Sequence, residues 1–559
     1  MHAYSGLPLG QFRRRPTLRF LTITGVALVA FCALLLSTQL DLSPYDEGLM
    51  LYGAEQVTKG KLPYRDFWTL YGPGAFYVLG ALFDSFEHSV AASRALDAAY
   101  KTGIVVASSL VLSRGCRWPL NIFSTGVILL LLMSLQQPGF PIFPAVMMSL
   151  LALYFLSAPQ AGSAWPRLRL LVGGALAGGA VLYRTDLGLY ALLACTVALF
   201  LAEPGGGPRR LRPERSRWIW AGAGVLLVVF PVTTALVRLV PASDLYQDLV
   251  RIPVQVYPSV RNLPWPEPSA IWFTPRMPEA LTAIVYAPVI AAACCLAIWA
   301  TFGFRRDKSA PLAIPPVPMA LTVLAALYLI KGAIRVEPVH MAPALVASTL
   351  AMTTTFAARA AGRPGSCLII VAAFICLWPL VGPALRLEKE LKLAAKTAMT
   401  GTVPGIWTRI ADACGRPALA RLRCATTTED RVETARFLAD HTPAGQTVYV
   451  GTGRHDRLFV NDVSLYFLSG TSAATKWHDL HPGVQTTVEI QREMIEDFRR
   501  TPPTWVVIDS QWDRMEEPNL NGFSSGGTLL DDYLRENYAL RRTIGPYRLL
   551  APRRPGSPS

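Results

Sequence analysis

Two adjacent carboxylates, Asp46 and Glu47, come shortly after the first long apolar run of the chain, which covers residues 18 to 38. They lie in a stretch dense in Tyr, Trp, Pro and Gly, residues 39 to 71. A carboxylate held next to lipid is costly and usually has a function. We therefore interpret Asp46 as a candidate general base, with Glu47 beside it. The structural alternative is that Asp46 caps a helix that begins at Glu47.

Other charged residues near the ends of apolar runs are candidates for binding an anionic substrate. Arg65 and Asp66 lie in the same stretch as the acidic pair, within PYRDFW. The tripeptide RTD, residues 184 to 186, joins two apolar runs without a proper loop. Arg184 either binds a phosphate group or pairs with Asp186 to close a tight turn, and the sequence leaves both interpretations open.

A denser group of charges lies in KGAIRVEPVH, residues 331 to 340. Lysine and arginine at the end of an apolar run often extend toward the membrane surface. That explanation does not account for a histidine after a proline. A cluster of cationic donors is what a lipid phosphate requires, so we predict that Lys331, Arg335 and His340 bind substrate.

Three charged residues in SRALDAAYK, Arg94, Asp97 and Lys101, are spaced to lie on one face of a helix. Charges in this pattern most often form a structural network inside a helix bundle. Arg94, which we place nearest the outer surface, is also a candidate to reach substrate.

Histidine and aspartate residues recur near the C-terminus, and a metal site is one interpretation of them. The residues are His455, Asp456, His478, Asp479 and His481. Their spacing matches no template for a metal site, so we predict neither a metal nor another cofactor. We interpret these segments instead as polar loops that dock the C-terminal part on the membrane part.

Composition identifies an α-helical polytopic membrane protein. The chain is 52% hydrophobic and 16% charged, whereas soluble domains carry about 25% charged residues. Apolar runs of membrane-spanning length recur along it. The net charge of +15 does not indicate a nucleic-acid partner, because the arginines cluster in short loops between apolar runs. The first run is longer than a signal peptide's apolar region and no cleavage site follows it, so we expect an uncleaved helix.

Basic loops alternate with loops that are acidic, aromatic or rich in proline. Placing the basic loops in the cytoplasm gives about 11 crossings, a cytoplasmic N-terminus and an extracytoplasmic C-terminal part. This alternation requires an odd number of crossings between Tyr71 and Arg114, yet residues 72 to 113 hold two apolar stretches. Either residues 72 to 90 form a short re-entrant or tilted element, or the charge rule fails there once.

The chain divides by composition into a membrane part and a smaller soluble part. We predict a membrane domain at residues 1 to 387, a helical connector at 388 to 430, an α/β domain at 431 to 552 and a disordered tail at 553 to 559. Within the α/β domain, ETARFLADH and EIQREMIEDFRR predict helices, and QTVYVGT and TWVVIDS predict strands.

Two cysteines, Cys414 and Cys424, lie outside the apolar runs that hold most of the nine cysteines. They fall in the predicted exported connector, where an oxidising compartment permits a disulfide. The sequence leaves open whether the two residues pair.

Residues 44 to 77, PYDEGLMLYGAEQVTKGKLPYRDFWTLYGPGAFY, resemble the first external loop of the GT-C glycosyltransferases. This superfamily of polytopic enzymes uses polyprenyl-phosphate sugars and includes protein O-mannosyltransferases and lipid A aminoarabinose transferases. The resemblance places the catalytic base of the family at Asp46, with Glu47 adjacent. RVEPVH resembles a late external loop whose basic residues face the lipid phosphate, which maps onto Arg335 and His340. The adjacent DE pair differs from the DxD pattern of metal-dependent relatives.

The resemblance implies an inverting hexosyl or pentosyl transferase in a bacterial inner membrane. Its partners would be a polyprenyl-phosphate sugar donor, a glycan, lipid or protein acceptor and the lipid bilayer, with no nucleic acid. Asp46 would deprotonate the acceptor hydroxyl, while Arg335, Arg184 and Lys331 stabilise the departing phosphate. Two alternatives stay open. A transporter or flippase for lipid-linked sugars would need polar residues at mid-depth of the bilayer, and a non-enzymatic envelope assembly protein would not depend on Asp46.

Overall fold

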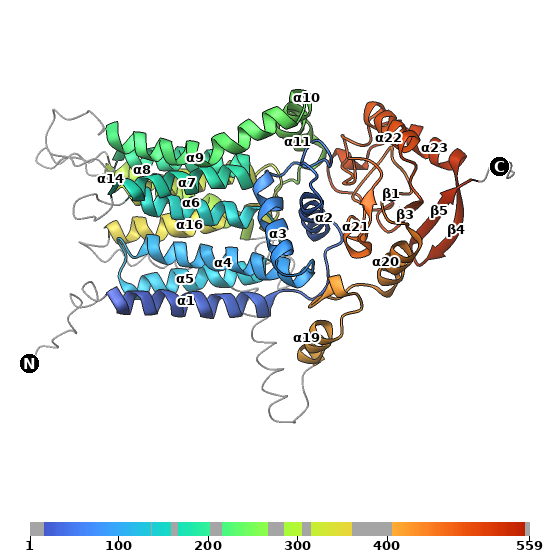
Figure 1. The fold of residues 1–559 in the computed structure, drawn as a ribbon. Helices are drawn as coiled ribbons and strands as arrows, with labels where there is room; N and C mark the ends of the chain where they lie inside the picture. The colour runs from blue at the N-terminus through green and yellow to red at the C-terminus, as the bar shows by residue number, and fades with distance from the viewer. Residues whose placement is uncertain are drawn as a thin grey trace, which may run out of the picture.

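The computed structural model describes residues 16–135, 137–157, 166–201, 215–266, 284–303, 315–359 and 405–553. Within these residues, long helices lie side by side in a bundle, and a β-sheet with its own helices lies beyond one end of it (Figure 1). Two shorter helices, α2 (Asp46–Thr58) and α3 (Pro73–Ser85), lie between the bundle and the sheet (Figure 1).

The bundle helices run back and forth along one direction. Among the described residues they are α1 (Pro16–Ser37), α4 (Val90–Leu112), α5 (Trp118–Ser134), α6 (Ile142–Leu156), α7 (Pro166–Tyr183), α8 (Thr185–Leu201), α9 (Arg215–Leu239), α14 (Ala287–Gly303), α15 (Pro316–Gly332) and α16 (Pro338–Arg359). Of the described helices, α1, α4, α9 and α16 are long and apolar enough to cross a membrane. The apolar run expected to make the last of about 11 crossings, residues 367 to 385, lies outside the described residues.

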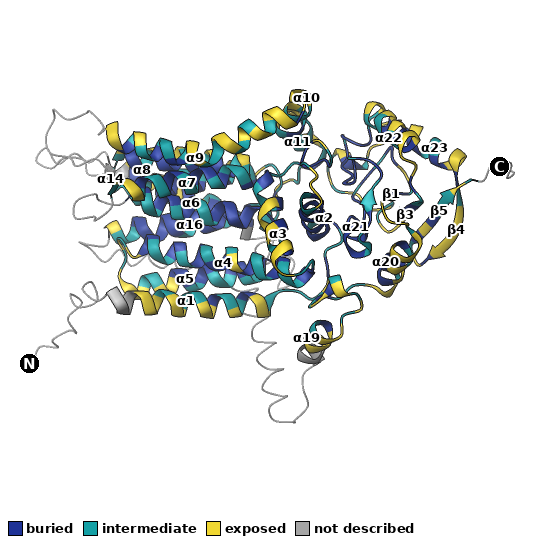
Figure 2. Ribbon diagram, viewed as in Figure 1, coloured by how far each residue is buried: buried dark blue, intermediate teal, exposed yellow. Residues whose placement is uncertain are grey.

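The outer surface of the bundle is apolar. Large hydrophobic side chains stand exposed along α1 and α9, among them Phe20, Leu28, Leu227 and Phe230, and Figure 2 shows exposed positions along both helices. Soluble proteins rarely expose an apolar surface of this extent to water. These helices therefore have the surface expected of segments that face lipid.

Helix α3 answers the question of how residues 72 to 113 cross the membrane. It begins at Pro73, a favoured first helical residue, and has 13 residues. A helix of that length spans about 20 Å, less than the hydrocarbon core of about 30 Å. It packs against α2 and α7 instead. Within this segment α4 alone has the length of a crossing, and one crossing is what the charge rule requires between Tyr71 and Arg114.

Irregular helical segments connect the bundle helices on the side of α2 and α3. They are α10 (Ala242–Tyr246), the π-helical segment η2 (Gln247–Val256), α11 (Tyr257–Val260) and η3 (Ile284–Tyr286). Long π-helical stretches are rare and often accompany functional sites. Figure 1 shows α10 and α11 beside the C-terminal part of the chain.

The C-terminal part contains a five-stranded sheet with strand order β2-β1-β3-β5-β4. Strand β1 is parallel to both β2 and β3, whereas β5 is antiparallel to β3 and β4. The elements are α19 (Gly405–Gly415), η5 (Ala420–Leu422), α20 (Glu429–His441), β1 (Thr447–Thr452), α21 (Ser464–Ser469), β2 (Ser472–Ala473), α22 (Val488–Arg500), β3 (Trp505–Asp509), η6 (Leu520–Gly522), α23 (Leu529–Asn537), β4 (Tyr538–Ile544) and β5 (Tyr547–Pro552). The helices expected at ETARFLADH and EIQREMIEDFRR are α20 and α22, and the two expected strands are β1 and β3.

Helix α2 holds the two parts of the chain together. Its apolar residues share one buried cluster with residues of α21, such as Leu49 with Leu465. Gly48 approaches the C-terminal part so closely that an added Cβ would lie 2.7 Å from the backbone nitrogen of Ser464. A glycine is therefore required directly after the acidic pair, because a larger residue would push the C-terminal part away.

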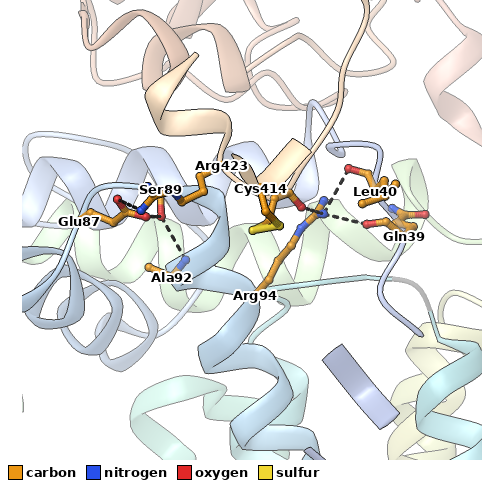
Figure 3. Close-up of a disulfide and its surroundings, with 9 residues drawn as sticks. Gln39, Leu40, Glu87, Ser89, Ala92, Arg94, Cys414 and Arg423 are labelled. Carbon is orange, nitrogen blue, oxygen red and sulfur yellow. Dashed lines mark hydrogen bonds and ion pairs between the residues drawn. A yellow bond between two sulfur atoms is a disulfide. The ribbon is translucent and has the colours of Figure 1, made fainter. Parts of the chain in front are cut away.

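A disulfide joins Cys414 and Cys424, with 4.0 Å between their Cα atoms. The sequence had left this pairing open. Figure 3 shows the bridge next to the guanidinium group of Arg94, which donates to the Cys424 carbonyl at 3.3 Å. The bridge therefore fixes the chain that follows α19 against the outer end of α4.

Candidate active site

Asp46 is the first residue of α2. The residue before it, Tyr45, serves as the N-cap and makes no side-chain capping hydrogen bond. The alternative in which Asp46 caps a helix starting at Glu47 is therefore wrong. Among the described residues, the Asp46 carboxylate has neither an ion-pair nor a hydrogen-bond partner, so its oxygens are available to a substrate.

Charges from three separate segments act on Asp46. Burial raises the pKa of its carboxyl to about 6, and the negative charge of Glu337 adds to this effect. The positive charges of Arg261 and Arg335 oppose the rise. A carboxylate with a pKa near neutral, placed beside cationic groups, has the properties of a general base.

Glu47 points away from Asp46 and has a structural role. Its side chain is fully buried and makes two hydrogen bonds with Arg94, at 2.8 and 3.1 Å. Arg94 also donates to the carbonyls of Gln39 and Leu40, at 2.8 and 3.2 Å (Figure 3). The sequence analysis gave Glu47 as the neighbour of the base, and Arg94 either as part of a structural network or as a candidate to reach substrate. In the structure both residues make contacts that fasten α1, α2 and α4 together.

Asp97 and Lys101, which share a face of α4 with Arg94, form an ion pair with each other. Lys101 Nζ lies 2.8 Å from Asp97 Oδ2, and both side chains are buried. This is the structural network that the spacing of these residues favoured.

Residues 184 to 186 form a tight turn closed by an ion pair, which is one of the two interpretations that the sequence left open. Arg184 donates to both oxygens of Asp186, at 3.0 and 2.8 Å. Lys331 Nζ lies 3.6 Å from the same carboxylate. Thus the turn between α7 and α8 and the end of α15 bring two cations and one carboxylate together.

The Tyr71 hydroxyl is affected by the charges of both this cluster and Asp46. Burial raises the pKa of the Tyr71 hydroxyl well above its usual value, and the charges of Tyr257 and Asp46 add to the rise, while Arg184 opposes it. The guanidinium group of Arg184 also lies over the Tyr71 ring, 5.6 Å from its centre. Tyr71 therefore couples Asp46 to the Arg184 cluster electrostatically, and we call the groups around these residues the polar region.

Arg335 lies at the centre of the second cationic group. Its Nε donates to Glu337 at 3.1 Å, and its Nη1 donates to the carbonyl of Arg261 at 2.9 Å. Glu337 in turn contacts Nδ1 of His340 at 2.5 Å. Burial acts to raise the pKa of Glu337, but His340 and Arg335 lower it to about 2, so it stays ionised.

Arg261 and Glu517 complete this group, and the sequence analysis identified neither. Arg335 donates to both oxygens of Glu517, at 2.5 and 3.1 Å, and Arg261 Nη1 lies 3.5 Å from Glu517 Oε2. Arg261 directly follows α11, in a stretch rich in proline and aromatic residues, which is the kind of loop that the alternation of loops assigns to the outside. No other feature of the sequence marks Arg261. None marks Glu517, which follows β3 in the C-terminal part.

Arg65 and Asp66 form a local pair on the surface. Arg65 donates to both oxygens of Asp66, at 3.0 and 2.8 Å, and its side chain is 42% exposed. Asp66 also accepts from the backbone of Leu62 at 2.8 Å. These contacts shape the turn after α2, and in the described structure neither side chain forms a hydrogen bond or an ion pair with Asp46.

The loop from Trp477 to His481 docks on the segment that carries Asp46. His481 Nε2 lies 2.5 Å from the Tyr45 hydroxyl, and the His478 ring stacks against Tyr52 with 4.5 Å between centres. Asp479 lies 3.4 Å from His481. In the part of the chain that the structure describes, no three His, Cys, Asp or Glu side chains are grouped to hold a metal ion. The contacts of His481 with Tyr45 and of His478 with Tyr52 are of the kind that the docking interpretation predicts for this loop.

The other pair of candidate metal ligands lies inside the C-terminal part. His455 contacts the Tyr449 hydroxyl at 2.7 Å and Asp531 at 2.7 Å. Asp456 pairs with Arg454. Both residues serve the packing around β1.

No protein-family model matches this chain, and no curated protein matches it. Among solved structures, it is similar to ArnT from Cupriavidus metallidurans bound to undecaprenyl phosphate, with a TM-score of 0.55 and 14% identity over 96% of this chain and 98% of that chain. The apo structure of ArnT from the same organism gives a TM-score of 0.52 at 14% identity, over the same shares of the two chains. The chain therefore shares the overall fold of these two ArnT structures.

Proposed function

We propose that this protein is an integral membrane glycosyltransferase that moves a sugar from a polyprenyl-phosphate donor to an acceptor hydroxyl, with Asp46 as general base. One observation carries the proposal. A partnerless carboxylate with a pKa raised to about 6 lies beside Arg261 and Arg335, within a fold like that of ArnT bound to undecaprenyl phosphate.

The reaction that fits this arrangement is a direct displacement. Asp46 takes the proton of the acceptor hydroxyl, and the acceptor oxygen forms a bond to the anomeric carbon. The bond from that carbon to the phosphate oxygen breaks, and the polyprenyl phosphate leaves with the electron pair. One displacement inverts the anomeric centre. No nucleotide is consumed, because the lipid phosphate is already a leaving group.

Cations around Asp46 would stabilise the negative charge that develops on the leaving phosphate. Arg335 and Arg261 act on Asp46 through their positive charges, and Arg184 and Lys331 both contact the carboxylate of Asp186. Fixed positive groups in a water-poor site lower the energy of such a transition state. Asp186 holds Arg184 and Lys331 in position. His340 holds Glu337, which in turn binds Arg335.

The test is release of polyprenyl phosphate by purified protein in nanodiscs that contain a panel of polyprenyl-phosphate sugars. Asp46→Asn should lower release by about 10²-fold or more, the scale on which general bases contribute. Asp84→Asn is the matched control, because Asp84 is an exposed carboxylate on α3. Thermal unfolding of both variants shows whether the fold is intact.

Three outcomes separate the function classes. Release that requires Asp46 supports the transferase. Full release by well-folded Asp46→Asn removes Asp46 from the mechanism. Translocation of the lipid across the bilayer without any release would replace the transferase with the transporter alternative.

A further inference from the structure

Arg261 has hydrogen-bonding capacity that the protein leaves unused. Its side chain is 5% exposed, and its Nε and Nη1 have no hydrogen-bond partner. Leaving charged donors unsatisfied in a buried place is costly. Arg184 and Arg335 each donate hydrogen bonds to a carboxylate, whereas Arg261 reaches Glu517 only at an ion-pair distance of 3.5 Å. The open donors of Arg261 thus indicate room for an anion.

A carboxylate already lies where such an anion would bind. Glu517 receives two hydrogen bonds from Arg335 and lies within 3.5 Å of Arg261 Nη1. Carboxylate and phosphate present similar pairs of oxygens to a guanidinium group, and both are bound in two-pronged fashion. Glu517 therefore occupies the position that a phosphate bound to these two arginines would take.

Glu517 differs from the other carboxylates of the site in its origin. Asp186 and Glu337 each lie two residues from the arginine that they bind, so each pair moves as one unit. Glu517 comes from the surface loop between β3 and α23, residues 510 to 528, most of which is exposed. Asn519 fastens this loop to the bundle side through one hydrogen bond to the Asn262 carbonyl, at 2.9 Å.

Charge balance requires Glu517 to move when a phosphate enters. Arg261 and Arg335 already face Glu337, Glu517 and Asp46. A phosphate added beside Glu517 would place a further anion around two cations in a buried region, where like charges repel strongly. Withdrawal of Glu517 removes that repulsion and frees both arginines.

We infer that Glu517 is an internal substitute for the donor phosphate, and that the two compete for Arg335 and Arg261. Glu517 thereby sets the affinity for the donor, and donor binding releases the loop of residues 510 to 528. The inference rests on the proposed function for the identity of the phosphate compound. It adds a residue of the C-terminal part that controls donor binding.

The first test measures binding of undecaprenyl phosphate to the full-length protein in nanodiscs of uncharged lipid. Glu517→Gln keeps the shape of the side chain but removes its charge, and should bind the lipid roughly tenfold tighter than wild type. Glu516→Gln is the matched control, because Glu516 pairs with Arg457 on the surface, and should bind as wild type does. Equal or weaker binding by well-folded Glu517→Gln overturns the inference.

The second test needs no variant. Arg514 is exposed within the loop, so trypsin cleavage after it reports how firmly the loop is held. Undecaprenyl phosphate should accelerate this cleavage several-fold in wild-type protein. Cleavage that is unchanged or slower at saturating lipid overturns the inference.

The two proposals can fail separately, because these assays measure binding and not turnover. If Asp46→Asn abolishes release while Glu517→Gln binds like wild type, the transferase stands and the substitution model falls. If Asp46→Asn keeps full release while Glu517→Gln binds tighter, the reverse holds. Binding of inorganic phosphate, measured in the same way, distinguishes the source of the anion. If Glu517→Gln binds both inorganic phosphate and the lipid more tightly than wild type does, the site recognises the phosphate group itself. If the variant binds only the lipid more tightly, the site recognises the lipid phosphate.

Discussion

Asp46 and Glu47 are neighbours in the chain, yet their carboxylates have opposite surroundings. Glu47 is fully buried and bound by Arg94, whereas Asp46 has no partner among the described residues and lies near Arg261, Arg335 and Glu337. Successive side chains of a helix point about 100° apart. The first turn of α2 thus directs one carboxylate into the structure and the other toward the polar region.

Turnover should depend on pH through Asp46. A general base acts in its ionised form, and burial raises the pKa of Asp46 to about 6. We therefore expect kcat/KM to be level above this pH and to fall about tenfold per pH unit well below it. The measurement is release of polyprenyl phosphate from pH 4.5 to 8. An acid limb that persists unchanged in the residual activity of Asp46→Asn would assign the titration to another group.

Removing the charge of Glu337 should move that acid limb. Glu337 raises the pKa of Asp46 through its negative charge, so Glu337→Gln should lower this pKa and shift the limb to lower pH. A pH profile of the variant checks the direction. Glu87→Gln is the control, because Glu87 pairs with Arg423 on the surface. A shift to higher pH in Glu337→Gln would contradict the electrostatic account.

Arg94 should matter more for stability than for substrate binding. Arg94→Met removes the partner of Glu47 and leaves a buried carboxylate uncompensated, which costs about 3 to 5 kcal/mol. We expect a markedly lower Tm in detergent. The double variant Arg94→Met with Glu47→Leu should recover much of the loss, because a buried ion pair can be replaced by apolar side chains. A normal Tm with a raised KM would instead place Arg94 at the substrate.

Chelation of divalent metal should leave turnover unchanged within about twofold. The carboxylate next to Asp46 is bound to Arg94, and arginines already surround the proposed phosphate position, where fixed cations can supply the electrostatic stabilisation. Release of polyprenyl phosphate is measured before and after treatment with EDTA, and again after Mg²⁺, Mn²⁺ or Zn²⁺ is added. Loss of activity that one of these ions restores would show that the site uses a metal.

Much of the fold could be predicted from patterns that are local in the sequence. Apolar runs, basic loops and the alternation of helix and strand signals predicted the bundle helices and the elements α20, β1, α22 and β3. The position of α3 could not be fixed in this way. Its apolar content resembles that of a crossing, and only its length and its packing against α2 and α7 distinguish it.

The candidate site was less accessible to sequence reasoning, because its residues meet only through tertiary contacts. Asp46 and Arg335 were identified by the kind of segment in which they lie. The partner of Glu47 was not foreseeable, since Arg94 reaches it from another helix. Arg261 and Glu517 lie in different parts of the chain, and neither has a local pattern that marks it.

The docking of the C-terminal part on α2 sets an order on biosynthesis. Asp46 is translated well before His481, which contacts Tyr45, and Glu517, which binds Arg335; both follow it by more than 430 residues. The helices that precede them can insert into the membrane before these partners exist. An unfinished chain would therefore carry the proposed base without the loops that surround it, and the site around Asp46 would be assembled only after those loops have been made.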